Sequence, residues 1–133
     1  MIIDTSAIIA ILRNEPDAAF FARAIAASTS RLMSAVNFVE SAVVIDASRD
    51  PIASRKFDEL VRQANISVEP VTFEQAQIAR DAYRDFGRGS GHAAKLNFGD
   101  CFAYALAKTA SEPLLFKGND FAFTDVIQAN KSA

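Results

Sequence analysis

The sequence predicts an α/β fold, a three-layer sandwich with a short, mostly parallel central sheet. Short apolar segments alternate along the chain with longer segments in which apolar residues recur at helical spacing. This alternation is typical of parallel sheets covered by helices. The chain has 133 residues, 50% of them apolar, which suffices for one sizeable core and is too short for two ordinary domains. We therefore expect residues 1–133 to form a single domain.

The first half of the chain opens with the apolar strand Met1–Ile3, and Thr5 and Ser6 are suited to cap the helix that follows. Pro16 begins a second helix and Ser34 caps a third, while Asp50-Pro51 marks the next break. The expected elements are a strand at 1–3, helices at 7–13 and 17–27, a strand at 31–33, a helix after 34 and a helix at 51–65.

In the second half, Pro70 lies near the end of an apolar segment and marks it as an edge strand, because proline cannot donate to a strand ladder. Asn97 caps a nearly all-apolar helix that should lie deep in the protein. The expected elements are an edge strand at 66–71, a helix at 73–86, a glycine loop at 87–91, a helix at 98–109, a buried strand at 114–116, a short final strand at 126–127 and a frayed tail after 130.

Composition narrows the setting in which the chain works. No apolar run approaches the roughly 18 residues of a membrane helix, and no export signal is visible, so we expect no membrane association. Cys101 is the single cysteine and has no internal partner, which makes the cytoplasm the default location. A net charge of −2 argues against a broad basic surface that coats nucleic acid. Any RNA contact is expected to be local.

Four acidic residues occupy apolar settings, unlike the other carboxylates of the chain. Asp4 and Asp120 each follow an apolar strand, where the alternatives are a helix cap and a plain turn residue. Glu40 falls on a helix within the arc of Val36, Val39, Val43, Val44 and Ala47. A carboxylate on such a face needs a metal ion or, as the alternative, an arginine. Asp100 lies in the first turn of the apolar helix, where interaction with the helix dipole is the alternative.

The four acids belong to two strand ends and two helices that must pack on one sheet, so we expect them to meet at the same sheet edge. Clustered carboxylates repel one another unless cations lie between them. An oxygen-only set favours Mg²⁺ or Mn²⁺ over Zn²⁺. Such a cation orients a phosphodiester, activates a water and stabilises the leaving oxygen. The residues thus predict a metal-dependent site for phosphodiester cleavage that uses Asp4, Glu40, Asp100 and Asp120.

The same residues carry a family resemblance. The opening MIIDTSA, Glu40 on its helix, LNFGDCFAYA at 96–105 and LLFKGNDF at 114–121 look like the PIN domain of VapC-type toxins. The resemblance covers essentially the whole chain. It implies a Mg²⁺- or Mn²⁺-dependent endoribonuclease that is the toxin of a bacterial type II toxin–antitoxin pair, forms a homodimer and is silenced by a VapB-like antitoxin.

The resemblance also implies roles for individual positions. Asp4, Glu40 and Asp100 resemble the family's firm acidic set, and Asp120 resembles its more variable fourth acid. Ser6 matches a hydroxyl position near the metal. Some relatives carry an acid where this chain has Asn119, so a second metal is expected to be weakly held, and one-metal and two-metal mechanisms stay open.

Outside the acids, Arg80, Arg84 and Arg88 recur at four-residue intervals, and Lys95 follows in the glycine region. These residues are a possible RNA-binding stripe, although Asp81 and Asp85 beside them make an ordinary charged helix face equally consistent. His92 in its glycine loop is expected to be solvent-exposed. The early helices are rich in aromatic residues beyond the needs of a core, and the surplus is a candidate dimer face or antitoxin groove. These aromatic residues are Phe20, Phe21, Phe38 and Phe57.

Two other functions fit parts of the pattern. A phosphoryl-transfer or receiver-type domain also places acids at strand ends around Mg²⁺. A haloacid-dehalogenase-like enzyme would have a second Asp where this chain has Ser6, and a receiver would have its Asp near Glu69-Pro70. The second alternative is a catalytically silent binding module of the same fold. The intact set of four acids argues against it.

Overall fold

A computed structural model describes residues 1–129. Its four strands form one sheet in the order β3-β2-β1-β4, and every neighbouring pair is parallel. This confirms the predicted α/β class and the parallel sheet. The elements are β1 (Ile2–Ile3), α1 (Thr5–Leu12), α2 (Ala18–Ala27), β2 (Leu32–Ser34), α3 (Ala35–Asp46), α4 (Pro51–Gln63), β3 (Ser67–Glu69), α5 (Phe73–Phe86), α6 (Phe98–Ala110), β4 (Leu114–Leu115) and the 3₁₀ helix η1 (Asp120–Phe123).

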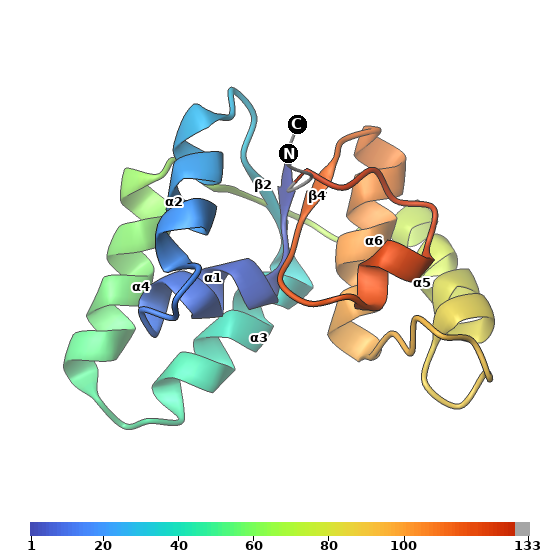
Figure 1. The fold of residues 1–133 in the computed structure, drawn as a ribbon, viewed down its shortest axis with the longest axis horizontal. Helices are drawn as coiled ribbons and strands as arrows, with labels where there is room; N and C mark the ends of the chain where they lie inside the picture. Colours follow the sequence, from blue (N-terminus) through green and yellow to red (C-terminus); the bar gives the residue numbers. More distant parts are fainter. Residues whose placement is uncertain (130–133) are drawn as a thin grey trace.

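Helices cover both faces of the sheet, α1 to α4 on one side and α5 with α6 on the other (Figure 1). Successive strand residues point to opposite faces, so each strand contributes to two cores. Ile2 and Leu114 pack with α5 and α6. Ile3 and Leu115 pack with the layer of α1 to α4. All four side chains are fully buried, which explains why β1 and β4 are wholly apolar.

The strand order reverses at β1, because β1 has β2 on one side and β4 on the other. In open parallel sheets, sites form beyond the carboxyl ends of strands at such a reversal. Asp4 follows β1, and the segment 116–120 follows β4. The backbone N–H of Asp4 donates to the carbonyl of Leu115 at 3.0 Å, which brings the two strand ends together.

Several predicted boundaries differ from the structure. Helix α1 begins at Thr5, because the side chain of Asp4 and not those of Thr5 or Ser6 provides its cap. The expected strand at 126–127 is wrong, since these two residues belong to no strand and the isolated bridge with Leu114 is formed by the neighbouring Gln128. The 3₁₀ helix η1 was not expected. The edge position of β3 is confirmed, and the predicted frayed tail after Asn130 lies outside the described residues.

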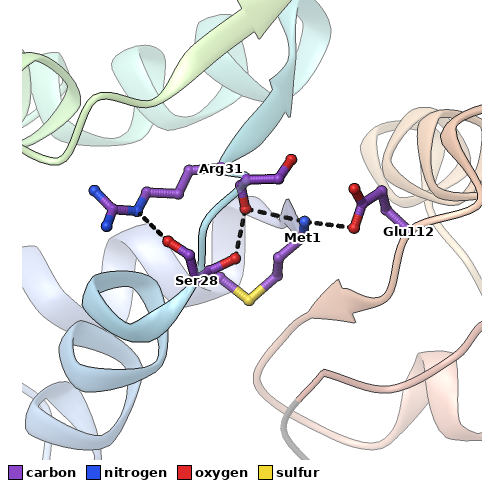
Figure 2. A network of polar contacts seen from close by, with 5 residues as sticks. Met1, Ser28, Arg31 and Glu112 are labelled. Atoms are coloured by element: carbon purple, nitrogen blue, oxygen red, sulfur yellow. Dashed lines mark hydrogen bonds and ion pairs between the residues drawn. The ribbon is translucent and has the colours of Figure 1, made fainter.

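The opposite end of the sheet is fastened by polar contacts of the first residue (Figure 2). The Met1 amine donates to the carbonyl of Ser30 at 3.0 Å and to Glu112 Oε2 at 2.8 Å. Arg31 in turn donates to the carbonyls of Ser28 and Ala64. These contacts tie the start of β1 to the segments that precede β2 and β4. None of the helices in residues 1–129 combines the length and apolarity needed to cross a bilayer.

Candidate active site

Three of the four predicted acids line one cavity of about 380 Å³ at the carboxyl end of the sheet. Asp4 comes from the end of β1, Glu40 from α3 and Asp100 from the first turn of α6. The structure therefore gathers carboxylates that lie 36 and 60 residues apart in the sequence. The other polar residues of the cavity are Thr5, Ser6, Arg13, Glu15, Asn97 and Lys117.

Asp4 is the most deeply buried of these acids, with 3% of its surface exposed. Its Oδ2 accepts hydrogen bonds from the backbone N–H of Ser6 at 3.0 Å and from the Ser6 hydroxyl at 2.6 Å. Its Oδ1 has no hydrogen-bond partner in the described part of the chain. Burial, with a smaller contribution from the charge of Glu40, raises the pKa of Asp4 to about 6. Asp4 caps α1 and still keeps one oxygen free for another ligand.

Glu40 is held by hydrogen bonds from neutral groups. Thr5 Oγ1 donates to Glu40 Oε1 at 2.6 Å, and Asn37 Nδ2 lies 3.4 Å from the same oxygen. Asn37 also donates to the carbonyl of Gly99 at 3.0 Å, which links α3 to α6. Within residues 1–129 no arginine forms an ion pair with Glu40, so the structural ion pair considered as an alternative is not present.

The reasoning that placed Glu40 on a buried valine face is wrong. Val39 and Val43 are 57% and 61% exposed. The buried face of α3 is instead formed by Asn37, Ser41 and Ile45. Glu40 is half-buried at the edge of that polar face, where it reaches the cavity.

Asp100 is built into the capping box of α6. Its side chain accepts the backbone N–H of Asn97 at 3.0 Å, and Asn97 Oδ1 accepts the backbone N–H of Asp100 at 2.9 Å. Burial comes first and the charge of Asp4 second in raising the pKa of Asp100 to about 7. Asp100 therefore does interact with the N-terminus of α6, which was the alternative prediction for this residue. The effect of the Asp4 charge on its pKa indicates that the same carboxylate also faces the other acids.

Asp120 is set apart from the other three acids. It begins η1 and lines a neighbouring cavity together with Arg88, His92 and Lys95. Its charge nevertheless contributes to the raised pKa of Asp100, so the two carboxylates interact. Asn119 precedes it as the residue before η1 and makes no side-chain cap.

Ser6 connects the two strand ends. Its hydroxyl donates to Asp4 and accepts the backbone N–H of Lys117 at 2.9 Å. The Lys117 ammonium is held by Glu15 and, at 3.0 Å, by Asp17. Sequence reasoning assigned Ser6 only through the family resemblance and missed four other residues around the acids. Thr5 was recognisable beside Asp4, whereas Asn37, Gly99 and Lys117 gave no local signal.

The chemistry of the cavity fits a divalent cation. Its acidic donors are oxygen atoms, and one of them is a buried carboxylate oxygen without a partner among residues 1–129. Burial first and repulsion between the carboxylates second raise the pKa values of Asp4 and Asp100. Among residues 1–129, no three or more His, Cys, Asp or Glu side chains are already placed to hold a metal ion. Hydroxyl and amide donors from Thr5, Ser6 and Asn97 occupy carboxylate oxygens instead.

The predicted basic stripe is divided between three environments. Arg80 lines an apolar groove between α5 and α6. Arg84 is exposed and its guanidinium pairs with Asp81 and Asp85. Arg88 and Lys95 line the cavity of Asp120, which measures about 740 Å³. The expectation of an exposed His92 is wrong, because this residue is half-buried and its ring packs edge-on against Phe86.

The early aromatic residues mostly belong to the core. Phe21 and Phe57 are 3% and 2% exposed, and Phe38 packs against the same core, whereas Phe20 is 39% exposed. Larger exposed apolar side chains occur on α3, α5 and the start of α6. They are Val39, Val43, Phe73, Tyr83 and Phe98.

Comparison with known proteins agrees with this architecture. Residues 1–126 match the PIN domain family. The chain is 59% identical over 129 residues to ribonuclease VapC28 of Mycobacterium tuberculosis, with 97% of each chain covered, and 48% identical over 126 residues to ribonuclease VapC42 of the same species, with 95% and 96% covered. The crystal structure of M. tuberculosis VapC20, a sarcin-ricin loop cleaving toxin, superposes with a TM-score of 0.74 at 15% identity over 96% of both chains. A toxin–antitoxin complex from Klebsiella pneumoniae gives 0.70 at 15% identity over 98% of both chains.

Proposed function

The chain belongs to the PIN-domain family, in its VapC-like group, and from this premise we propose that it is a Mg²⁺- or Mn²⁺-dependent endoribonuclease, the toxin of a bacterial type II toxin–antitoxin pair. The observation that carries the proposal is the cavity in which Asp4, Glu40 and Asp100 meet without a compensating arginine or lysine ion pair among residues 1–129. Curated relatives at 47–59% identity are named ribonucleases.

In this proposal Asp4, Glu40 and Asp100 hold the cation, and Asp120 assists from the neighbouring cavity. A bound divalent cation supplies positive charge that orients the phosphodiester and favours ionisation of the attacking water. Asp4 contributes its unpartnered Oδ1, and Ser6 keeps Oδ2 in place. Thr5 and Asn37 fix the Glu40 carboxylate, and Asn97 fixes that of Asp100. These neutral donors orient the carboxylates without neutralising them.

Ion binding is proposed to rearrange some side chains. No set of three acids among residues 1–129 already forms a coordination site, so we expect the hydroxyl donors on Asp4 and Glu40 to yield part of their hydrogen bonding to the cation. Removing mutual repulsion between buried carboxylates favours this exchange. Binding should therefore stabilise the fold, because the cation binds the native arrangement and not the unfolded chain.

The RNA backbone is proposed to approach across Arg88 and Lys95, which line the cavity of Asp120, and across Arg80 in the neighbouring groove between α5 and α6. Arg84, the remaining residue of the predicted stripe, is already paired with Asp81 and Asp85 and has less charge to offer a phosphate. Local basic groups agree with a net charge of −2 better than a broad basic surface does.

Partners and location complete the proposal. A cognate VapB-like antitoxin is proposed to silence the enzyme, and a homodimer is proposed to cover apolar side chains such as Val39, Val43 and Phe98, which are 57%, 61% and 70% exposed. We place the protein in the cytoplasm, in line with its single cysteine, which is buried. Size-exclusion chromatography with light scattering, with and without a Val43→Asp substitution, tests the dimer.

The decisive experiment compares RNA cleavage by the parent with cleavage by Asp4→Asn and Asp100→Asn. Total RNA is incubated with Mg²⁺ or Mn²⁺, and EDTA provides the metal-free control. We expect cleavage by the parent only with metal, and a loss of at least about 100-fold in either variant. Asp58→Asn, an exposed substitution on α4, is the matched control and should cut like the parent. Full cleavage by both site variants would show that the site is assigned wrongly.

The PIN-domain match over residues 1–126 removes the support for a phosphoryl-transfer or receiver-type domain. The same RNA cleavage assay distinguishes the proposed enzyme from a catalytically silent binding module. It would bind RNA or antitoxin with the acids intact and release no RNA fragments at any metal concentration.

A further inference from the structure

The loop from Gly87 to Leu96 has a defined internal structure. Its ends are joined, because Arg88 N–H donates to the carbonyl of Leu96 and Leu96 N–H donates to the carbonyl of Phe86, at 3.0 and 2.9 Å. The Ser90 hydroxyl donates to the carbonyl of Gly87 at 2.6 Å. Ala94 and Leu96 are fully buried and anchor the loop to the core. The glycine-rich segment is therefore a preformed surface element.

His92 has its protonation pattern fixed by this loop. The backbone N–H of Ala94 donates to His92 Nδ1 at 3.1 Å, so Nδ1 carries a lone pair and the hydrogen of the neutral ring resides on Nε2. The ring is also held by its edge-on contact with Phe86, with ring centroids 4.9 Å apart. His92 thus presents one neutral N–H donor from a fixed ring, and it lines the cavity of about 740 Å³.

The cavity combines this donor with two positive charges. Arg88 and Lys95 line it, and neither forms an ion pair with another group in residues 1–129. The single carboxylate of the lining is Asp120, so the lining carries one excess positive charge. Charged and neutral N–H donors converging on an open cavity suit the oxygen atoms of a phosphate.

We propose that this loop cavity is a subsite for a backbone phosphate of the RNA next to the phosphodiester that is cut, with Arg88 and Lys95 supplying charge and His92 one uncharged hydrogen bond. The inference rests on the proposed function. The chain connects the two cavities at two points, because Lys95 and Asp120 line the loop cavity while Asn97 and Lys117, two and three residues away, line the cavity of the acids. An RNA strand with one phosphate at the acids is therefore proposed to have a neighbouring phosphate at the loop.

Salt dependence separates the two kinds of contact. For single-stranded nucleic acid, each phosphate neutralised by a cationic side chain contributes about 0.7 to the slope of log affinity against log salt concentration. An uncharged hydrogen bond adds affinity without changing this slope. Arg88→Gln and Lys95→Gln should each lower the slope by about 0.7. His92→Asn should weaken binding about 2- to 10-fold and leave the slope unchanged.

The His92→Asn variant is chosen to preserve the loop. An asparagine carbonyl can accept the Ala94 N–H, as Nδ1 does, but has no donor at the position of Nε2. His92→Gln is the complementary variant, because its amide can donate near the position of Nε2 and it loses the local acceptor. We expect His92→Gln to bind RNA more tightly than His92→Asn if the donor matters.

The measurement is fluorescence anisotropy with a labelled, 2′-O-methylated single-stranded oligonucleotide in EDTA, over a series of KCl concentrations. EDTA removes the divalent cation that cleavage requires, and the modified sugar protects the RNA from attack by its own 2′-hydroxyl, so binding is read without catalysis. Arg84→Gln is the matched control, since this arginine belongs to the same sequence stripe but is paired with Asp81 and Asp85, and its slope should equal that of the parent. Circular dichroism of each variant checks that the fold is retained.

The outcomes distinguish this inference from the proposed function. Unchanged slopes for Arg88→Gln and Lys95→Gln in folded protein overturn the phosphate subsite, even if the enzyme cuts RNA. A slope change as large for Arg84→Gln assigns the contact to the helix face and also overturns it. Lowered slopes in a protein that releases no RNA fragments with metal would support the subsite while the nuclease proposal fails.

Discussion

The backbone of Gly99 lies directly against the carboxylate of Glu40, so that a Cβ at position 99 would stand 2.1 Å from Glu40 Oε2. Glycine is required here by the closeness of a side chain from another helix, and not by backbone conformation. The contact makes α6 a wall for the carboxylate that α3 supplies, while Asn37 and the carbonyl of Gly99 hold the two helices together.

Gly99→Ala should therefore displace Glu40 and reduce cleavage at least about 10-fold with little loss of stability. The obstructing atoms lie at the end of a long side chain that can move aside. Replacing glycine by alanine also stabilises a protein by roughly 0.4–1 kcal/mol through the lower entropy of the unfolded chain, which offsets the remaining crowding. Cleavage rates and the free energy of unfolding measure the two effects. In a Glu40→Ala background, Gly99→Ala should have no further effect on activity and should stabilise the protein. Equal activity losses in both backgrounds would contradict this explanation.

Asp4→Asn should make the metal-free protein more stable than the parent at neutral pH. Burial raises the pKa of Asp4 to about 6 from an ordinary value of 3.8, so the folded protein binds a proton more tightly than the unfolded chain. The contribution of Asp4 to stability is therefore largest below pH 4 and is lost as the pH rises through 6. The shift corresponds to about 3 kcal/mol.

This difference is measured by urea unfolding of both proteins in EDTA at several pH values. The advantage of Asp4→Asn over the parent should grow between pH 4 and pH 7 and level off above it. Saturating Mn²⁺ should remove the advantage, because the cation stabilises only the parent site. If the difference in free energy of unfolding between the two proteins does not vary with pH, burial does not raise the pKa of Asp4.

Thr5→Val should reduce cleavage without weakening RNA binding. The substitution keeps the shape of the side chain and removes the hydroxyl that donates to Glu40 Oε1 at 2.6 Å. We expect a destabilisation of about 1 kcal/mol and a lower kcat with an unchanged KM. Thr5→Ser retains the donor and is the control. If the valine variant cuts RNA as fast as the parent, the hydrogen bond to Glu40 has no role in cleavage.

Asp120→Asn should show that the fourth acid has a different role in metal binding from the other three. Asp100 lines the cavity of Asp4 and Glu40, whereas Asp120 lines the basic cavity beside it. Calorimetric titration with Mn²⁺ should show a larger loss of affinity for Asp100→Asn than for Asp120→Asn. In EDTA, Asp120→Asn should bind the modified oligonucleotide more tightly than the parent, since it removes the negative charge of the basic cavity. Equal losses of Mn²⁺ affinity would place Asp120 among the direct ligands.

The sequence predicts the elements well where local chemistry determines them. Helix α5 has the predicted bounds, Ser34 and Asn97 cap the expected helices, and the strand that carries Pro70 beside it lies at the sheet edge. The strand at 126–127 fails because two apolar residues do not determine pairing by themselves. The separation of Asp120 from the other acids depends on η1 and on the fold of the glycine loop. Neither feature has a periodic sequence pattern that could predict it.

Glu40 lies in the acid cavity although the predicted reason for its position is wrong. The valines of α3 suggest an apolar buried face, yet Val39 and Val43 are exposed and Asn37 and Ser41 are fully buried. A helix that supports a polar site buries the side chains that hold the site. Its hydrophobic periodicity then gives the wrong face, because the usual link between burial and apolarity is broken there.

The order of the strands also has a consequence for synthesis of the chain. β1 carries Asp4 and emerges first, but its neighbour β4 and the helix that carries Asp100 are made last. A growing polypeptide therefore holds only part of the acid cluster until α6 is complete. We therefore expect the three acids to come together only after the last α-helix has been synthesised.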